Sequence, residues 1–194
     1  MPQHASVISR REALRRTALL LGGVVSAPAL AGVLAGCETP HGESGWRPRA
    51  LTSEQTDLVA TIAEHILPET DTPGARAVGV HRFIDTMLAE HYGTSDRATF
   101  LTGLSDADAR AARSGARNFV GASKSQQIAI LTELDREAYS NVAAPHFFRT
   151  MKELTLLGYY TSEAGATKEL QYNPAPGRFE GCVPISRIGR AWAV

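Results

Sequence analysis

The residues best suited to chemistry gather in one stretch of the chain, between Glu64 and Asp85. The acidic and histidine side chains in this stretch are Glu64, His65, Glu69, Asp71, His81 and Asp85. His81 and Asp85 are four residues apart, so in a helix they would share one face and could bind a metal ion or move a proton. The stretch also contains a Pro-Glu-Thr-Asp-Thr-Pro-Gly turn, where Asp71 and Thr72 can satisfy backbone donors instead. We favour this structural role over a metal-dependent enzyme that uses His65, His81 and Asp85.

Other candidates for chemistry are weaker. Asp106 and Asp108 would lie on different sides of a helix and read as a solvated face, and His146 follows Pro145 at an expected helix start. The chain has no G-x-G-x-x-G after a strand, no phosphate loop, no H-E-x-x-H and no G-x-S-x-G. We therefore predict no catalytic, cofactor-binding or metal-binding residues in this chain.

Composition sets further bounds. The 194 residues suit one globular domain, and 20 basic residues balance 20 acidic ones, so no strong positive field is available for nucleic acid. Two cysteines cannot make a four-cysteine zinc site or an iron–sulfur cluster, and no C-x-x-C-H pattern attaches a haem.

The first residues predict an export signal. Arg10 and Arg11 stand in a basic segment that precedes an uncharged, apolar run at 17–36, as in twin-arginine signals. A membrane-spanning helix is the alternative, but four glycines and a proline in the run dilute its hydrophobicity. We expect residues 1–36 to be a signal peptide and the protein to face the periplasm of a bacterium.

The run ends in Leu-Ala-Gly-Cys, which resembles the lipobox of bacterial lipoproteins. This pattern predicts that Cys37 becomes a lipidated N-terminus that holds the protein on the membrane. Simple cleavage that leaves an ordinary thiol is the alternative. Residues 37–50 are polar and rich in Pro and Gly, and they read as a flexible tether.

Apolar residues at helical spacing predict five helices within a domain at 51–170. The expected inward faces are Leu58, Val59, Ile62 and Ile66; Val80, Phe83, Ile84, Met87 and Leu88; Phe100, Leu101, Leu104, Ala107 and Ala111, with Phe119 beyond; Ile128, Leu131, Leu134 and Ala138; and Phe148, Met151, Leu154 and Leu157. No strand alternation competes. The fold class is therefore all-α, a small bundle or orthogonal array of about five helices.

Residue types at the expected helix ends support these limits. Thr52 with Gln55 and Ser123 with Gln126 have the spacing of capping boxes, and Pro145 suits a first helical position. Gly158 would be the C-cap of the last helix.

Residues 172–184 contain too much Pro and Gly for a helix and should be extended or looped, so 171–194 is expected to form an extended arm. Its aromatic residues need a surface, which is either the protein's own helices or another subunit. With Cys37 lipidated, Cys182 is the remaining thiol in an oxidising compartment, so it either bonds to a partner or is a buried free thiol.

Several segments together resemble the gluconate 2-dehydrogenase subunit 3 family. They are Ile-Leu-Pro-Glu-Thr-Asp-Thr-Pro-Gly-Ala at 66–75, residues 80–85, Phe147, Phe148 and Leu154, Gly-Tyr-Tyr-Thr-Ser-Glu at 158–163, Tyr172, Pro176-Gly177 and Gly181-Cys182. The resemblance covers nearly all of the chain after the signal peptide.

The resemblance implies an accessory role. In that family a separate large flavoprotein carries FAD and oxidises the sugar, often passing electrons to a cytochrome c subunit with haem c or to another acceptor. The small subunit supports its folding, stability and export. We accordingly expect a non-catalytic small subunit that guides twin-arginine export of an FAD-containing sugar, glucoside or gluconate dehydrogenase. A free-standing helical lipoprotein with a binding role is the alternative.

The partner interface is expected in the last third of the chain. The residues assigned to it are Gly158, Tyr159, Tyr160, Thr161, Ser162, Glu163, Tyr172, Phe179, Cys182 and Trp192. Cys182 is the candidate for a disulfide to the flavin subunit.

Overall fold

The computed structural model of the chain describes residues 45–175, 177 and 182–193. The chain divides into two units, Met1–Trp46 and Arg47–Val194, and the described helices belong to the second. The export signal, the lipobox with Cys37, most of the tether, and Phe179 all lie outside the described residues. The predictions made for them therefore stay predictions.

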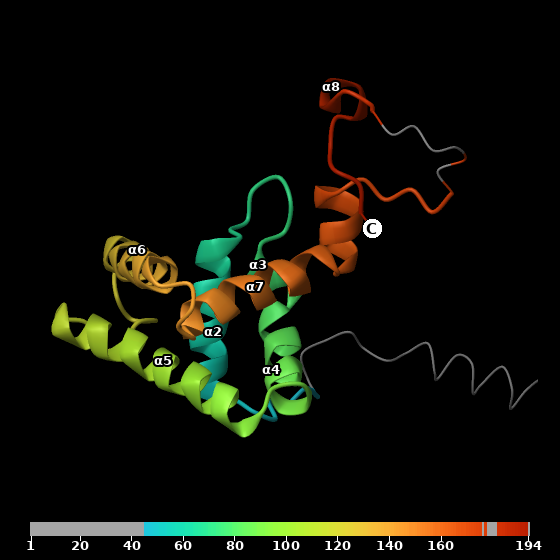
Figure 1. Cartoon of the computed structure of the whole chain (residues 1–194). Helices are drawn as coiled ribbons and strands as arrows, with labels where there is room; N and C mark the ends of the chain where they lie inside the picture. Colours follow the sequence, from blue (N-terminus) through green and yellow to red (C-terminus); the bar gives the residue numbers. More distant parts are fainter. Residues whose placement is uncertain (1–44, 176, 178–181, 194) are drawn as a thin grey trace, which may run out of the picture. The chain divides into compact units, whose positions relative to one another are not determined.

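The described part of the chain is helical (Figure 1). Its elements are α2 Ser53–Ile66, α3 Ala75–Val78, α4 Val80–Glu90, α5 Thr94–Arg113, α6 Lys124–Ser140, α7 Phe147–Tyr160, the π-helix η1 Gly165–Glu169 and α8 Ile185–Ile188. No strand forms among the described residues, and one isolated bridge joins Gln171 to Trp192. The expected all-α class is confirmed.

Helix α7 is the element that the other long helices share. It packs against α2, α4, α5 and α6, while α2 also packs against α4, and α5 against α6. The largest fully buried side chains come from every one of these helices and include Ile62, Ile84, Leu88, Phe100, Leu104, Leu134 and Met151. Each such side chain contributes about 1.5–3 kcal/mol when it leaves water. The core is therefore built around α7.

Both expected capping boxes are present. The Thr52 hydroxyl accepts from the backbone N–H of Gln55, whose side chain accepts from Thr52 N–H in return, and Ser123 and Gln126 make the same exchange. These caps fix where α2 and α6 begin. The four-residue helix α3 was not predicted, because one helical turn is too short to show a period.

The inward face of α6 differs from the expected one by a single position. Ile128 is 49% exposed, whereas Gln127 and Ile130 are buried. The Gln127 amide donates to the carbonyl of Phe119 and its oxygen lies 2.7 Å from Nε2 of His65. A polar residue with satisfied partners thus takes the position that a hydrophobic pattern assigns to Ile128. Phe119 is buried too, but in the loop after α5.

The limits of α7 were also predicted wrongly. The helix begins at Phe147 with His146 as its N-cap, so Pro145 precedes the helix, and it ends at Tyr160 with Thr161 as C-cap. Leu157 is 48% exposed, while Gly158 is buried in the helix. The inward position is occupied by Gly158. Because glycine carries no hydrophobic signal, the apolar pattern assigned the inward position to Leu157 instead.

Candidate partner interface

The turn at 68–74 is fixed by a carboxylate from α2. Glu64 accepts from the backbone N–H groups of Glu69 and Arg76, each at 2.9 Å, and so spans the turn from one end to the other. Within it, Thr70 N–H donates to the carbonyl of Thr72 at 3.1 Å. The acidic residues of this region do serve the turn, but Glu64 supplies the backbone acceptor that we had assigned to Asp71 and Thr72. Glu69 and Asp71 are exposed at its tip.

Tyr159 links this turn to the end of α7. Its hydroxyl donates to the carbonyl of Pro73 at 2.8 Å and lies 3.3 Å from Oγ1 of Thr72. Thr72 in turn donates to the Glu169 carboxylate of η1 at 2.8 Å. Two segments that are far apart in the sequence are therefore joined by buried or half-buried hydrogen bonds, which makes the end of α7, the turn and η1 one connected structure.

Two glycines allow the close packing in this region. A Cβ on Gly158 would lie 2.6 Å from the Phe83 ring of α4, and a Cβ on Gly165 would lie 2.0 Å from the carbonyl oxygen of Tyr159. Neither position has room for a larger residue. The glycines of the Gly-Tyr-Tyr-Thr-Ser-Glu stretch and of η1 therefore serve close backbone approach.

The residues expected at the partner interface are divided between core and surface. Gly158 and Tyr159 are buried inside the chain, and Tyr160 is half-buried with its ring edge-on to Tyr159. Thr161 and Glu163 are exposed, and Ser162 is half-buried. In this stretch, the surface open to a partner therefore consists of the residues after α7, while the preceding ones support it.

Among its described residues, the arm contains the short helix α8, which was not predicted, and the end of the arm folds back onto its start. Gln171 N–H donates to the carbonyl of Ala191 and Ala193 N–H donates to the carbonyl of Gln171, at 2.8 and 3.0 Å. These bonds bring Trp192 beside Gln171 and close a loop that carries α8 (Figure 1). The base of the arm is thus held by backbone hydrogen bonds.

Large apolar side chains on this arm remain exposed. The exposed fractions are 60% for Tyr172, 65% for Ile185 and 42% for Trp192. These three residues are therefore not buried against the protein's own helices, which was one of the two alternatives. Cys182 is also exposed and free, so the alternative of a buried thiol is wrong.

Two of the residues considered for metal or proton chemistry, Asp85 and His65, make hydrogen bonds within the fold. The Asp85 carboxylate is fully buried and accepts from the backbone N–H groups of Arg49, Ala50 and Leu51 at 2.8–2.9 Å. His65 is hydrogen-bonded to the side chain of Gln127, and His81 is half-buried on α4. Among the described residues, no group of three or more His, Cys, Asp or Glu side chains is placed to hold a metal ion. The constellation of His65, His81 and Asp85 is therefore not assembled as a metal site.

Asp106 and Asp108 are both used within the fold, so the expectation of a plain solvated face is wrong. Asp106 pairs with Arg110 at 2.7 Å, and Arg110 also makes a two-pronged pair with Glu137 of α6. Arg110 accordingly lowers the pKa of Glu137. Asp108 accepts from the N–H of Phe119 at 2.9 Å. These contacts tie α5 to α6 and to the loop between them.

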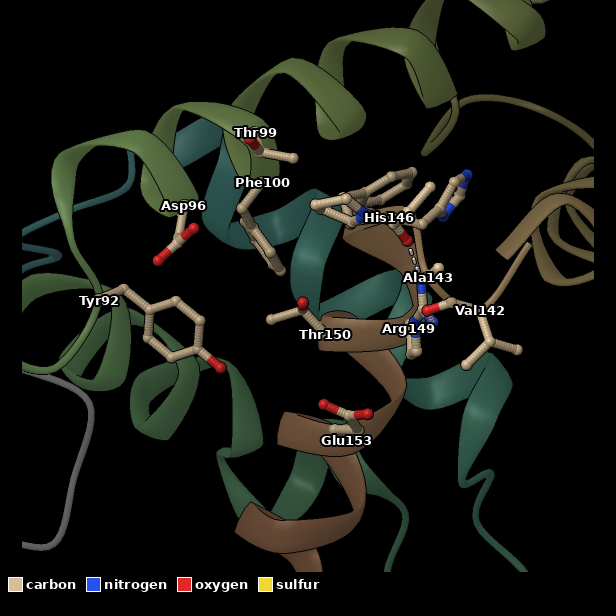
Figure 2. A pocket seen from close by; sticks show the side chains of 13 residues that line it. Tyr92, Asp96, Thr99, Phe100, Val142, Ala143, His146, Arg149, Thr150 and Glu153 are labelled. Atoms are coloured by element: carbon tan, nitrogen blue, oxygen red, sulfur yellow. Dashed lines mark hydrogen bonds between the residues drawn. The ribbon is translucent and has the colours of Figure 1, made fainter. Parts of the chain in front are cut away.

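A cavity of about 300 Å³ opens between α5, the loop before α7, and α7 itself (Figure 2). Tyr92 stands in one wall, with the carboxylates of Asp96 and Glu153 on either side of it in the view and Phe100 across from it. Burial, and then the nearby carboxylates of Glu153 and Asp96, raise the pKa of Tyr92 above its ordinary value. Sequence reasoning missed this cavity, because its residues come from segments with no shared spacing.

No helix within the described residues is long and apolar enough to span a membrane.

Comparison with known proteins gives one match. The family model of gluconate 2-dehydrogenase subunit 3 matches residues 53–177, which run from the start of α2 into the arm. No curated protein and no solved structure matches the chain. The match includes the turn at 68–74, Tyr159 and η1, and it ends before Cys182, α8 and Trp192.

Proposed function

The chain belongs to the gluconate 2-dehydrogenase subunit 3 family, and on this premise we propose that it is the non-catalytic small subunit that stabilises and exports the FAD-containing subunit of a sugar, glucoside or gluconate dehydrogenase. In this proposal the large subunit carries the flavin and the substrate site. A cytochrome c subunit is a further candidate member of the complex.

The observation that carries this proposal is the exposed apolar surface of the arm. Tyr172, Ile185 and Trp192 are exposed although the base of the arm is fixed by hydrogen bonds. Apolar and aromatic side chains held on a fixed scaffold are typical of the buried centre of a protein interface. A partner that covers them would gain burial without first ordering the base of the arm.

The export part of the proposal rests on Arg10 and Arg11. The twin-arginine route carries folded proteins, which suits a flavoprotein whose cofactor is inserted before export. A large subunit without a signal of its own would then travel bound to this chain. Lipidation at Cys37 would hold the complex on the periplasmic face of the membrane, through the tether at 37–50.

The proposal is tested by recovery of the tagged full chain from membranes of cells that also express its neighbouring subunits. Flavin absorbance and subunit masses are read on the recovered material. We expect a larger, yellow subunit to co-purify. A colourless lone chain would contradict the proposal and favour the free-standing lipoprotein.

A matched pair of variants then tests whether the arm is the interface. Tyr172→Ser removes an aromatic ring that is 60% exposed on the arm, and Tyr139→Ser removes one that is 48% exposed on α6. We expect the first to reduce the flavin recovered per chain and the second to leave it unchanged. Equal recovery in both would remove the arm from the interface.

The proposed disulfide is tested separately. Cys182 is exposed, so its thiol is accessible to a cysteine of the flavin subunit. Non-reducing gels of the complex should then show a heavier band that Cys182→Ser removes. An unchanged monomer band would exclude the disulfide and leave the non-covalent complex standing.

A further inference from the structure

The cavity beside Tyr92 has the features of a socket for a single side chain. Its volume is about 300 Å³, and its walls combine the Tyr92 and Phe100 rings with backbone of the loop at 142–146. Val142 at its rim is 68% exposed. Neither the expected interface residues nor the arm includes any residue of this cavity.

Two carboxylates and one guanidinium line the cavity, so its lining has an excess of one negative charge. Asp96 comes from the first turn of α5 and Glu153 from the middle of α7, and neither carboxylate has an ion-pair partner among the described residues. Arg149 also lines the wall, but its guanidinium donates to the carbonyls of Val142 and Ala144. It therefore holds the loop in place and leaves both carboxylates to face the cavity.

The negative field reaches the aromatic wall. Figure 2 shows the carboxylates of Asp96 and Glu153 on either side of the Tyr92 ring, and both carboxylates raise the pKa of its phenol. A cation that entered between them would meet two anions and the face of an aromatic ring. Charge-assisted hydrogen bonds and cation–π contact both strengthen when water is excluded.

We propose that this cavity binds one basic side chain, an arginine or lysine, of the flavin subunit that the chain accompanies. The proposal rests on the proposed function, since that function supplies the partner. Docking would also cover Val142 and so remove an exposed apolar side chain from water. The cavity then provides a charged contact, in addition to the apolar contact that the arm provides.

The two contacts would be well separated. The cavity lies at the start of α7, and the arm follows η1 beyond its end (Figure 1). A helix of 14 residues is about 20 Å long. A partner that reaches both would therefore lie along α7, and loss of one contact would weaken the complex without abolishing it.

The test measures association of the full chain with the flavin subunit for the wild type, for Asp96→Asn, for Glu153→Gln and for the double variant. Both side chains are exposed, so folding is expected to persist and is checked by thermal melting. We expect about a tenfold rise in Kd for the double variant and a smaller rise for each single one. Binding by the wild type should weaken with added salt, and this dependence should be reduced in the double variant.

Glu133→Gln is the matched control. It removes the same charge from a side chain that is 60% exposed on α6, outside the cavity. If it weakens binding as much as Glu153→Gln does, the effect is one of net charge, and the proposal that the cavity binds a basic side chain is wrong. If the double variant binds the flavin subunit as tightly as the wild type does, the proposed role of the cavity is also wrong, while the proposed function stays intact. If the wild type recovers no flavin subunit at all, the proposed function is wrong, and the proposed role of the cavity is wrong with it.

Discussion

Asp85 and Leu51 are joined by a hydrogen bond of 2.9 Å between the buried carboxylate and the first buried residue of the domain. The same Oδ1 accepts from Ala50, and Oδ2 accepts from Arg49. One fully buried side chain on α4 thus holds the segment through which the chain enters the helical domain. This use of Asp85 explains how a carboxylate is tolerated in the core: its lone pairs are taken by backbone donors.

Asp85→Ala should therefore destabilise the domain strongly. It leaves three backbone N–H groups without their acceptor, and we expect the free energy of unfolding to fall by about 3 kcal/mol or more. Urea denaturation measures the change. Asp57→Ala is the control, because Asp57 is 51% exposed and pairs with Arg76 at the surface, a contact worth about 1 kcal/mol or less. A similar small loss in both variants would show that Asp85 does not anchor the entry segment.

Tyr159→Phe should loosen the turn at 68–74 while leaving α7 in place. The variant keeps the buried ring but loses the bond to the Pro73 carbonyl, and we expect a loss of about 1–2 kcal/mol. Thr72→Val removes the hydroxyl that lies between Tyr159 and Glu169. Because the two hydroxyls share one network, the double variant should lose less than the sum of the single losses. Strict additivity, measured by denaturation, would contradict the network.

The general architecture could be predicted from sequence because it depends on local signals. Capping residues such as Thr52 and Ser123 act within three residues, and apolar spacing shows the faces of the long helices. Errors arose where a non-hydrophobic residue occupies an inward position, as Gln127 does through its bonds to Phe119 and His65, and as Gly158 does through its contact with Phe83.

The candidate site was less accessible to sequence reasoning, because its contacts join distant segments. Nothing in the spacing of Thr72, Tyr159 and Glu169 indicates that their side chains meet. Asp85 was singled out for its type and its distance from His81, yet its partners are backbone groups 34–36 residues away, which carry no side-chain signature. The sequence could not tell whether the protein's own helices bury the aromatic residues of the arm, and the structure leaves Tyr172 and Trp192 exposed.

Gly103→Ala should disturb the crossing of α5 and α7. A Cβ at this position would lie 2.0 Å from Cγ of Phe147, so the helices must separate or the ring must move. Alanine gains up to about 1 kcal/mol in helix propensity, but overpacking costs about 1–3 kcal/mol, so we expect a net loss of stability.

Two variants make this prediction specific. Ser105→Ala, at an exposed position of α5, controls for propensity, and Phe147→Leu should recover part of the loss in the Gly103→Ala background. A Gly103→Ala variant as stable as the wild type in thermal melting would refute the close approach.

His146 should make the domain less stable in mild acid. Its Nδ1 accepts from Phe148 N–H at the start of α7, so the cap requires the neutral ring. Burial lowers its pKa below the ordinary value of 6.5, with Arg149 and Arg110 also lowering it and Glu137 and Asp106 opposing the shift. The unfolded chain therefore binds a proton that the folded chain does not, and stability falls as the pH drops from 6.5 toward the lower folded pKa.

His146→Asn isolates this effect, since asparagine caps a helix without titrating. We expect the variant to have a flatter dependence of unfolding free energy on pH between about pH 7 and pH 5. The carboxylate of Glu137 does not confuse the measurement, because Arg110 lowers its pKa and its contribution is lost at more acid pH. The same slope in both proteins over this range would exclude His146 as the responsible group.

Changing Arg10 and Arg11 to Lys should retain both this chain and the flavoprotein activity in the cytoplasm. If the large subunit travels bound to this one, it has no other route, so loss of the signal must retain both chains together. Arg15 and Arg16 changed to Lys form the matched control, because they remove two arginines from the same basic segment but leave the twin pair. Activity is assayed in periplasmic and cytoplasmic fractions with a flavoprotein electron acceptor. Activity that still appears in the periplasm while this chain is retained would show that the large subunit is exported independently.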